Sequence, residues 1–528
     1  MDTKALRQKI LDLAIRGKLV PQDPNDEPAS VLLERIRAQK QQMVREGKLK
    51  SKDIKDDTVI FVGEDNLHYE KFADGSVKCI EDEIPFDLPD GWVWGRLTTL
   101  LDIFITGPFG SSLHKSDYVE NGIPLINPMN IVDGEIIPID KMQISNETVE
   151  RLASFKVIPN DIVIARRGDM GRCAVVHYTQ TGWLCGTGSF VLRLSTFLWP
   201  EYFAACIRSP YAVTYLSGNS IGNTMLNLNQ AILKNLLLPV PPFKEQKRII
   251  DGINNADAYL NQLSDEREHL IATVAKTKAK ILDLAIRGQL VPQNPSDEPA
   301  SVLLDRIRIE KEELIRQGKL KRDKKESVIF RGDDNSYYEK VGGEVICIDN
   351  MIPFEIPESW AWCRGYSCFE GMASIKPHGD FFDYIDIDAI DNRSHCIKEA
   401  KHLPVAKAPS RASRALQSGS VLFSLVRPYL ENIALVDEEH SHCIASTGFY
   451  VCNSNGVFLP EFLFFLMISR YVVSGLNQYM KGDNSPSISK DNIEDWIYPI
   501  PPIEEQEAIC FKLKEVFSAI GHIEKSLR

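Results

Sequence analysis

A long stretch in the middle of the chain places its hydrophobic residues at alternating steps of four and three. The apolar positions are Ile249, Ile253, Ala256, Leu260, Leu263, Leu270, Val274, Ile281 and Leu284, with polar breaks at Arg267 and Thr277. This is the a/d pattern of a coiled coil held for about five heptads. It predicts a long helix with a partner helix, because each such side chain forgoes roughly 1.5–3 kcal/mol if it is left in water.

Both ends of the chain carry parts of the same seam. The C-terminus repeats its first half 260 residues later, and the N-terminus repeats its second half; the positions are Ile509, Leu513, Val516, Ile520, Ile523 and Leu527, and Leu6, Ile10 and Leu13. We therefore expect the two terminal helices to lie antiparallel to the central helix and to cover its seam. Residues 249–284 would span roughly 52 Å.

Two segments of the chain are nearly identical in sequence. Residues 9–33 return at 280–304 with 22 of 25 residues the same, at an offset of about half the chain. Trp-x-Trp at Trp92 returns 268 residues later, and Pro-Pro-x-x-Glu-Gln at Pro241 returns 260 residues later. Residues 98–160 and 366–418 barely match, so one frame carries two different surfaces.

The repeat and the seam together predict the domain organisation. The fold class is α/β (α+β), with two pseudo-twofold-related globular domains separated by long antiparallel coiled-coil helices. The predicted parts are an N-terminal helical region at 1–60, a globular domain at 61–242, a central helical spacer at 243–325, a second globular domain at 326–502 and a C-terminal spacer helix at 503–528.

Shorter patterns predict local elements. Residues 29–45 and 300–316 are second helices after proline-rich turns. Residues 161–178 predict a strand, a basic glycine-bearing turn and a strand, and residues 419–436 have the same shape. Residues 203–216 and 462–476 have a helical pattern.

Composition narrows the class of protein. The chain has 528 residues, is 44% hydrophobic and 25% charged, and contains no apolar run or leader that would indicate a membrane span, so we expect a cytoplasmic protein. Eleven cysteines without a CxxC pair, among them Cys79 and Cys347, are interpreted as small buried hydrophobic residues. A net charge of −12 means that any DNA contact is local or is shared with a more basic partner.

Basic and amide side chains gather around predicted turns in both domains. Arginine pairs with guanine, asparagine pairs with adenine, and small turns let backbone N–H groups approach phosphate. The candidates in the first domain are Ser111, Ser112, Lys115, Arg166, Arg167, Arg172, Asn223, Thr224 and Asn227. Those in the second domain are Arg411, Arg414, Arg427, Tyr429, Asn432, Lys481, Asn484 and Ser485.

Several motifs carry a resemblance to a known family. LAIRGKLVPQ and LAIRGQLVPQ, the domain endings LLLPVPPFKEQKRII and IYPIPPIEEQEAI, GPFGSS, VLFSLVRPYLENIALV and ASTGFYV stand in this sequence. With them the chain resembles the specificity subunits of Type I restriction-modification enzymes over essentially its whole length. One departure is that the second domain has GMASIKPHG, residues 371–379, in place of a GPFGS-like opening.

The resemblance implies two target recognition domains, each reading half of a split, asymmetric sequence in double-stranded DNA, with the helical spacers setting the gap. It also implies that two modification subunits dock on the spacers and methylate adenine with S-adenosylmethionine. Two restriction subunits would translocate and cleave DNA with ATP and Mg²⁺. This chain would be non-catalytic, with no catalytic residues, bound metal or cofactor of its own.

Other functions stay open as alternatives. A metal-dependent nuclease could use Asp380, Glu399 and Lys401, and His440 and His442 could face a metal from one strand. A methyltransferase of the adenine type needs Asn or Asp before its Pro-Pro, where Val240 stands, and no GxxxxGK[ST] motif is present to bind ATP. An assembly scaffold that reads no DNA would keep the spacer and explain the acidity.

Overall fold

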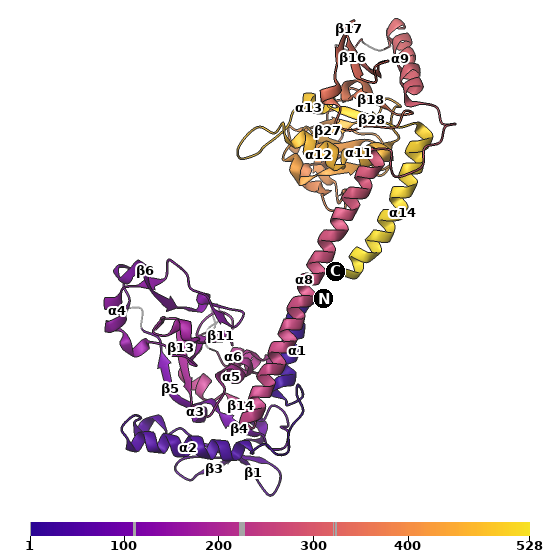
Figure 1. The fold of residues 1–528 in the computed structure, drawn as a ribbon. Helices are drawn as coiled ribbons and strands as arrows, with labels where there is room; N and C mark the ends of the chain where they lie inside the picture. The colour runs from indigo at the N-terminus through magenta and orange to yellow at the C-terminus, as the bar shows by residue number, and fades with distance from the viewer. Residues whose placement is uncertain (1, 109–111, 221–226, 320–321, 323–324, 528) are drawn as a thin grey trace. The chain divides into compact units, whose positions relative to one another are not determined.

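The structure, a computed structural model, describes residues 2–108, 112–220, 227–319, 322 and 325–527 (Figure 1). The chain divides into two compact units, Met1–Glu266 and Arg267–Arg528. Helix α8 (Phe243–Ile286) runs through this division as one element of 44 residues, which is about 66 Å at 1.5 Å per residue. Each unit mixes helices with short strands, so the predicted α/β class is confirmed.

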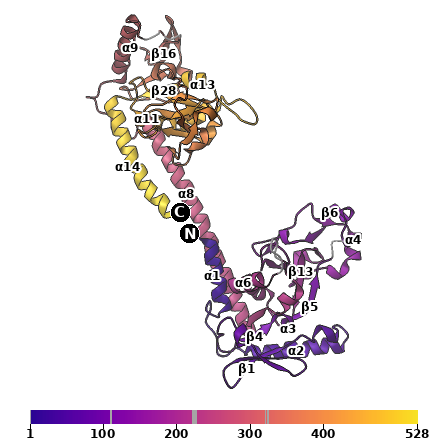
Figure 2. The same ribbon diagram turned by 180° about the vertical axis from the view of Figure 1, so that it is seen from behind.

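In the first unit, helix α1 (Thr3–Ile15) lies beside the first half of α8, as both views show (Figures 1 and 2). Near the start of α1, the Nη2 of Arg7 donates to Oδ1 of Asn261 at 2.6 Å, while Leu11 lies in one hydrophobic cluster with Ile249. Residue numbers thus rise along α1 as they fall along α8. The two helices are antiparallel, as the seam predicted.

In the second unit, helix α14 (Ile503–Leu527) covers the other half of α8. Arg267 donates to the carbonyl oxygen of Leu527, and Nζ of Lys278 lies 2.7 Å from Oε2 of Glu524. Leu513 shares a hydrophobic cluster with the buried end of α8. This pair is antiparallel as well.

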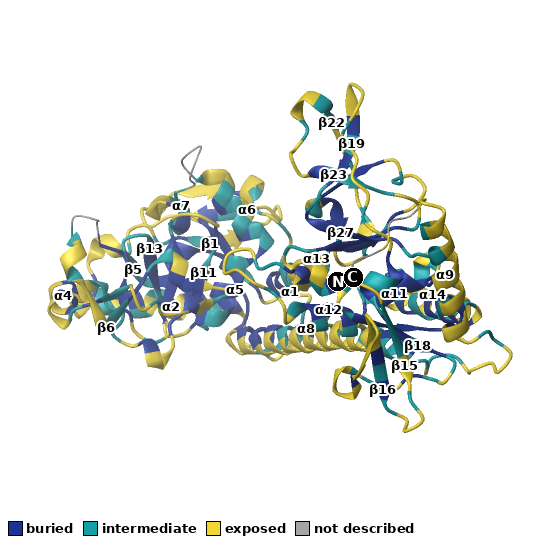
Figure 3. Cartoon of the chain, turned by 90° about the horizontal axis from the view of Figure 1, so that it is seen from above, coloured by how far each residue is buried: buried dark blue, intermediate teal, exposed yellow. Residues whose placement is uncertain are grey.

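The seam is not buried along its whole length, which corrects the prediction. Leu263 and Leu270 are each 48% exposed, and Leu6 and Ile523 are also exposed. The middle turns of α8 are accordingly drawn largely as exposed (Figure 3). Leu6 lies near the start of α1, Ile523 near the end of α14, and Leu263 and Leu270 in the middle of α8.

The buried face of the helices is also shifted from the predicted one at their outer ends. Ile249, Ile253, Leu260, Ile509, Leu513 and Ile520 are buried, whereas Ala256, Val274, Ile281, Leu284, Val516, Leu527, Ile10 and Leu13 are partly buried. The fully enclosed residues there are Leu11, Ala14 and Ile15 and their repeat counterparts Leu282, Ala285 and Ile286. These six lie in the hydrophobic clusters that the helices share with the cores of the globular domains.

The first unit is built on several small sheets. An antiparallel four-stranded sheet has the order β11 (Cys173–Val175), β10 (Ile162–Ala165), β13 (Ser189–Leu194) and β5 (Leu101–Thr106). The others are β1 (Val59–Val62), β2 (His68–Lys71) and β3 (Val77–Cys79); β12 (Leu184–Cys185), β6 (Tyr118–Ile126) and β9 (Gln143–Ile144); β4 (Val93–Arg96) with β14 (Leu237–Val240); and β7 (Ile131–Val132) with β8 (Glu135–Ile136).

The second unit repeats this plan with one rearranged sheet. A hairpin sheet of β25 (Ile433–Leu435), β24 (Val421–Ser424) and β27 (Phe449–Cys452) corresponds to β11, β10 and β13. In the divergent stretch, β22 (Lys401–Pro404), β19 (Phe381–Ile385) and β23 (Ala412–Ala415) join β26 (Ile444–Ser446) in a sheet of order β22-β19-β26-β23, and β20 (Ile390–Asp391) pairs with β21 (Cys396–Ile397) in a separate sheet. The outer sheets are β15 (Ser327–Arg331), β16 (Tyr337–Val341) and β17 (Glu344–Cys347), and β18 (Ala361–Arg364) with β28 (Ile497–Ile500).

The predicted second helices are confirmed as α2 (Ala29–Arg45) and α9 (Ala300–Arg316). Each stretch predicted as one helix in the domains is instead two, namely α5 (Pro200–Arg208) and α6 (Pro210–Asn219), and α11 (Pro460–Met467) and α12 (Arg470–Asn477). The break falls at Ser209 and Ser469, whose extended backbone lets each hydroxyl oxygen accept from an N–H of the next helix.

The Pro-Pro-x-x-Glu-Gln motif joins each domain to the helix that follows it. Glu245 accepts a hydrogen bond from the indole Nε1 of Trp92 at 3.0 Å, and Glu505 accepts one from Trp360 at 2.8 Å. Gln246, which follows Glu245, is fully buried. Its side-chain Oε1 accepts from the backbone N–H of Trp199, and its Nε2 donates to the carbonyl oxygen of Pro241. These residue types recur because the motif is a structural joint.

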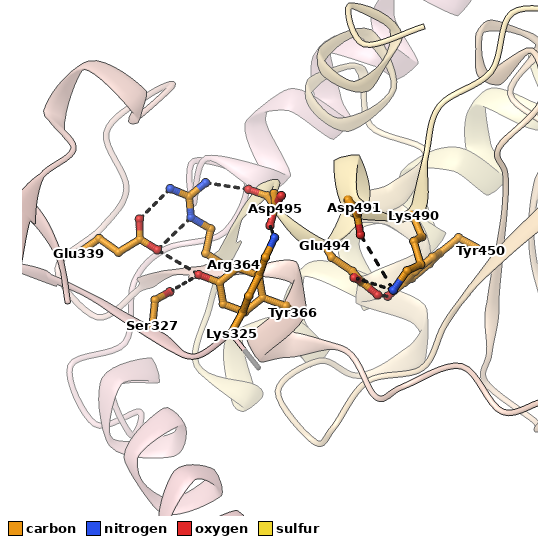
Figure 4. Close-up of polar contacts among 10 residues, drawn as sticks. All are labelled: Lys325, Ser327, Glu339, Arg364, Tyr366, Tyr450, Lys490, Asp491, Glu494 and Asp495. Atoms are coloured by element: carbon orange, nitrogen blue, oxygen red, sulfur yellow. Dashed lines mark hydrogen bonds and ion pairs between the residues drawn. The ribbon is translucent and has the colours of Figure 1, made fainter. Parts of the chain in front are cut away.

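A largely buried arginine forms an ion pair with a glutamate in each domain. Arg364 makes two hydrogen bonds to Glu339, at 3.0 and 2.7 Å, and a third to the carbonyl oxygen of Asp495 (Figure 4). Nζ of Lys325 holds the carboxylate of the same Asp495 at 2.7 Å. In the first unit Arg96 pairs in the same way with Glu70, so this clamp belongs to the shared frame.

Eight of the cysteines are buried, but Cys79, Cys347 and Cys396 are exposed. The interpretation of Cys79 and Cys347 as buried residues was wrong. Both lie on outer strands, β3 and β17, whose residues are all exposed.

Candidate nucleic-acid interface

Three strand ends meet at one edge of the main sheet in the first unit. Ala165 at the end of β10 pairs with Ser189 at the start of β13, and Phe190 pairs with Thr106 at the end of β5. Because antiparallel neighbours alternate in direction, the segments that follow Thr106 and Ala165 emerge from the same edge. Gly107 and Pro108, the described start of the GPFGSS stretch, are thus adjacent to the arginine turn.

The arginine turn is also tied to the segment that precedes helix α7 (Gln230–Lys234). The backbone N–H of Arg166 donates to the carbonyl oxygen of Gly188 at 2.8 Å. The backbone carbonyl oxygen of Arg166 accepts from the N–H of Leu228 at 2.9 Å, just before α7. Arg167 forms an isolated β-bridge with Asn227. Gly168 reverses the chain at φ +84°, a conformation that disfavours a side chain.

The arginines of this turn hold unused donors. The guanidinium of Arg166 lies 4.8 Å from the ring centre of Phe190, and Arg172 bonds the carbonyl of Pro128 and the carboxylate of Asp169. The Nε groups of Arg166 and Arg172 are buried and have no hydrogen-bond partner among the described residues. Burial, and then the charge of neighbouring Arg167, lowers the pKa of Arg166. An anion that reached this edge would satisfy these donors.

The remaining candidates of the first unit fall into two groups. Ser112 accepts a hydrogen bond from Arg151 through its carbonyl oxygen at 2.9 Å, and Lys115 is exposed. The other candidates, Ser111, Asn223 and Thr224, lie outside the described residues. Sequence reasoning missed Gln230, whose amide donates to Thr106 at 2.7 Å; its only signal was its position three residues after Asn227.

The second unit builds the same edge with different side chains. The backbone N–H of Leu425 donates to the carbonyl oxygen of Gly448 at 2.8 Å, and its carbonyl oxygen accepts from the N–H of Ile488 at 2.9 Å. Val426 forms an isolated β-bridge with Ser487. These are the bonds that Arg166 and Arg167 make in the first unit. Leu425, Val426 and Arg427 therefore occupy the places of Arg166, Arg167 and Gly168.

Arg427 stands where the first unit has a glycine and keeps the left-handed backbone, at φ +48°. Its N–H donates to the carbonyl of Pro486 at 2.7 Å, and Nη2 donates to that of Asn484 at 3.0 Å. A non-glycine residue in this region costs about 1–3 kcal/mol and is typical of functional loops. Arg427 is thus held at the edge against a backbone preference.

Other candidates surround Arg427. Tyr429, Lys481, Asn484 and Ser485 are exposed, and Asn432 accepts from the N–H of Ser424 through its carbonyl oxygen. Just before β23 in the neighbouring sheet, the backbone carbonyl oxygen of Arg411 accepts from the N–H of Thr447. Arg411 therefore lies close to Gly448, which bonds Leu425 at the edge. Arg414 lies further along β23, and its buried Nε has no partner among the described residues.

The nuclease and metal alternatives gain no support from the geometry. Lys401 is bonded by both carboxylate oxygens of Asp388, at 2.8 and 2.7 Å, and not by Asp380 or Glu399. His440 pairs with Asp437, whereas His442 pairs with Asp383. Within the described ranges, no group of three or more His, Cys, Asp or Glu residues could hold a metal ion. None of the helices in those ranges is long and apolar enough to cross a membrane.

Known proteins are similar to this chain in sequence and in fold. The family model for the Type I restriction modification DNA specificity domain matches residues 89–272. The EcoAI specificity subunit of Escherichia coli is 26% identical, over 98% of this chain and 90% of its own length, and the EcoEI subunit of the same species is 25% identical, over 99% and 91%.

Among solved structures, one described as the structural basis of complex assembly and conformational transition of the type I R-M system has the same fold. It matches 84% of this chain and 94% of its own with a TM-score of 0.50, at 16% identity. The motifs, the doubled α/β units and the full-length similarity to curated relatives agree. These similarities support the identification of the chain as a specificity subunit of a Type I restriction-modification enzyme.

Proposed function

We propose that this chain reads a bipartite, asymmetric site in double-stranded DNA, one half-site per domain. The observation that carries the proposal is the doubled sheet edge. One frame, with the same backbone hydrogen bonds, presents Arg166, Arg167 and Gly168 in the first unit and Leu425, Val426 and Arg427 in the second. Two copies of one edge with different side chains suit two different half-sites.

The chemistry of both edges favours a nucleic acid. Each combines arginine with exposed amide or hydroxyl groups, which match base edges, and with glycine, which lets backbone N–H groups approach phosphate. The protein as a whole is acidic, with a net charge of −12. DNA binding is therefore confined to these edges and is reinforced by more basic subunits of the complex.

The helical parts supply the spacing and the docking sites. Helix α8 with its partners α1 and α14 separates the halves of the DNA site, and two modification subunits dock on these helices. Two restriction subunits complete the assembly, which acts on DNA in the cytoplasm. S-adenosylmethionine, ATP and Mg²⁺ are used by those partner subunits, and this chain is non-catalytic.

A gel mobility-shift experiment with the purified modification subunits tests the proposal. We expect the complex to retain duplexes that carry one bipartite motif and to release duplexes in which either half is scrambled. Assembly without sequence-dependent retention would instead support a scaffold that reads no DNA. Cleavage by the isolated chain would support a nuclease.

A further inference from the structure

One acidic residue of the repeat has lost its internal partner in the first unit. Glu461 at the start of α11 lies 2.6 Å, through Oε1, from Nζ of Lys514 on α14. The corresponding residues, 260 positions earlier, are Glu201 and Asn254. Asparagine carries no charge, so Glu201 lacks the cation that its counterpart has.

Glu201 lines a cavity of about 430 Å³ in the first unit. Its Oε2 is buried without a hydrogen-bond partner among the described residues, and so is the indole Nε1 of Trp199 beside it. A buried carboxylate oxygen without a donor is destabilising, and a cation entering the cavity would remove that cost. Glu135, His177, Trp199, Lys247 and Asn254 line the same cavity.

The lysine and the histidine that border this cavity are paired with other carboxylates. Nζ of Lys247 is 2.5 Å from Asp251 and lies over the Trp199 ring at 5.8 Å, and His177 faces Glu135 at 3.4 Å. Arg208 also lines the cavity, and its backbone lies two turns further along α5, about 10 Å from that of Glu201 along the helix axis. The cavity therefore offers the carboxylate of Glu201, a group that binds a Lys or Arg side chain, beside a Trp199 ring that Lys247 already covers.

We infer that this cavity receives a lysine or arginine side chain from a protein that assembles with the chain, in the first unit only. The second unit supplies the model for the contact, since there a lysine of the same chain already occupies the equivalent position. The inference rests on the proposed function to the extent that the partner to be tested is the modification subunit of the same system.

Two substitutions test the inference. Asn254→Lys places in the first unit the lysine that the second unit has, and Glu201→Gln removes the charge. Isothermal titration of the full-length chain with the modification subunit should show at least about tenfold weaker binding for either variant. The matched control Glu461→Gln should change the affinity less than about twofold, because an exposed ion pair contributes little.

The outcomes separate this inference from the proposed function. Equal affinities of wild type, E201Q and N254K would overturn the inference alone, and the methylated DNA motif should be the same in all three at saturating subunit concentration. A wild-type chain that bound no modification subunit would overturn both proposals. Binding of spermidine that depends on Glu201, with no effect of E201Q on subunit affinity, would show a site for free amines instead.

Discussion

Arginine side chains at the two sheet edges are held in positions that their own domains do not fully satisfy. Arg166, Arg172 and Arg414 each bury an Nε donor without a partner among the described residues. The fixed fork of a guanidinium matches phosphate or the edge of guanine. These residues are therefore the first to substitute in a test of DNA contact.

Arg167 is the exposed arginine of the first turn. If it contacts a base, R167A should cost about 1–3 kcal/mol of binding and relax the sequence preference within one half-site only. If it contacts phosphate, binding should weaken for all sequences and the salt slope should fall by about one. Binding titrations at several salt concentrations measure both effects, with Lys71→Ala on the outer sheet as control. An R167A variant with wild-type affinity and salt slope would exclude either contact.

A substitution of Arg427 should change stability and DNA reading in opposite directions. Since it occupies a left-handed backbone position, R427G should relieve about 1–2 kcal/mol of strain and raise the Tm by about 2–4 °C, while reading of the second half-site is lost. The matched change in the first unit, G168A, should lower the Tm because it introduces that strain. A stable R427G variant that reads both half-sites normally would contradict the assigned role of Arg427.

Much of the candidate site could be predicted from the residues, but not its equivalences. Basic and small residues at turns identified the arginine turn of the first domain. The sequence matched residues 161–178 with 419–436 in shape, but the apolar side chains of Leu425 and Val426 gave no sign that they take the positions of Arg166 and Arg167 at a binding edge. That relation appears only in the backbone hydrogen bonds.

At the scale of elements, each domain is fastened to its helix by a buried glutamate. The sequence showed the Pro-Pro-x-x-Glu-Gln motif as a repeat. It did not show that Glu245 bonds Trp92, because the two residues lie 153 positions apart. The helical seam was predicted from its period, but its exposed middle was not. Periodicity shows which residues share a face and does not show where a partner helix ends.

The glutamate joint predicts a pH dependence of stability. Burial raises the pKa of Glu245, and hydrogen bonds from Trp92 and Gln22 only partly oppose this effect. A carboxyl group with a raised folded-state pKa contributes its stabilisation below its unfolded pKa, near 4.5, and loses it as the pH rises through the folded value. The Tm difference between wild type and E245Q should therefore be largest near pH 4 and should shrink towards pH 7. A difference independent of pH would contradict this account.

The long helix predicts a length dependence. Inserting one heptad near Leu263 keeps the seam in register and lengthens α8 by about 10.5 Å, or about three base pairs. The gap between the two half-sites should lengthen accordingly, with both half-site sequences unchanged. Sequencing of the DNA selected by the variant complex measures the gap. An unchanged gap would mean that α8 does not set the spacing.

At the scale of the whole molecule, two copies of one α/β unit share a continuous helix. The nearly identical segments 9–33 and 280–304 already indicated the doubling. That the two terminal helices lie end to end along α8 stays a prediction from the sequence. Residues 98–160 and 366–418 are the segments that differ most between the two copies. Their strands could not be predicted from the sequence. Their topology depends on pairings such as that of β19 with β26, which are far apart along the chain.

Methylation profiling of genomic DNA tests the central claim most directly. Cells that carry this chain and its modification subunits should methylate adenines in one bipartite motif, with two short specified halves separated by a fixed gap. Exchange of residues 98–235 for those of a relative should alter one half of that motif and leave the other half and the gap unchanged. A single uninterrupted motif, or a change in both halves after the exchange, would contradict the account.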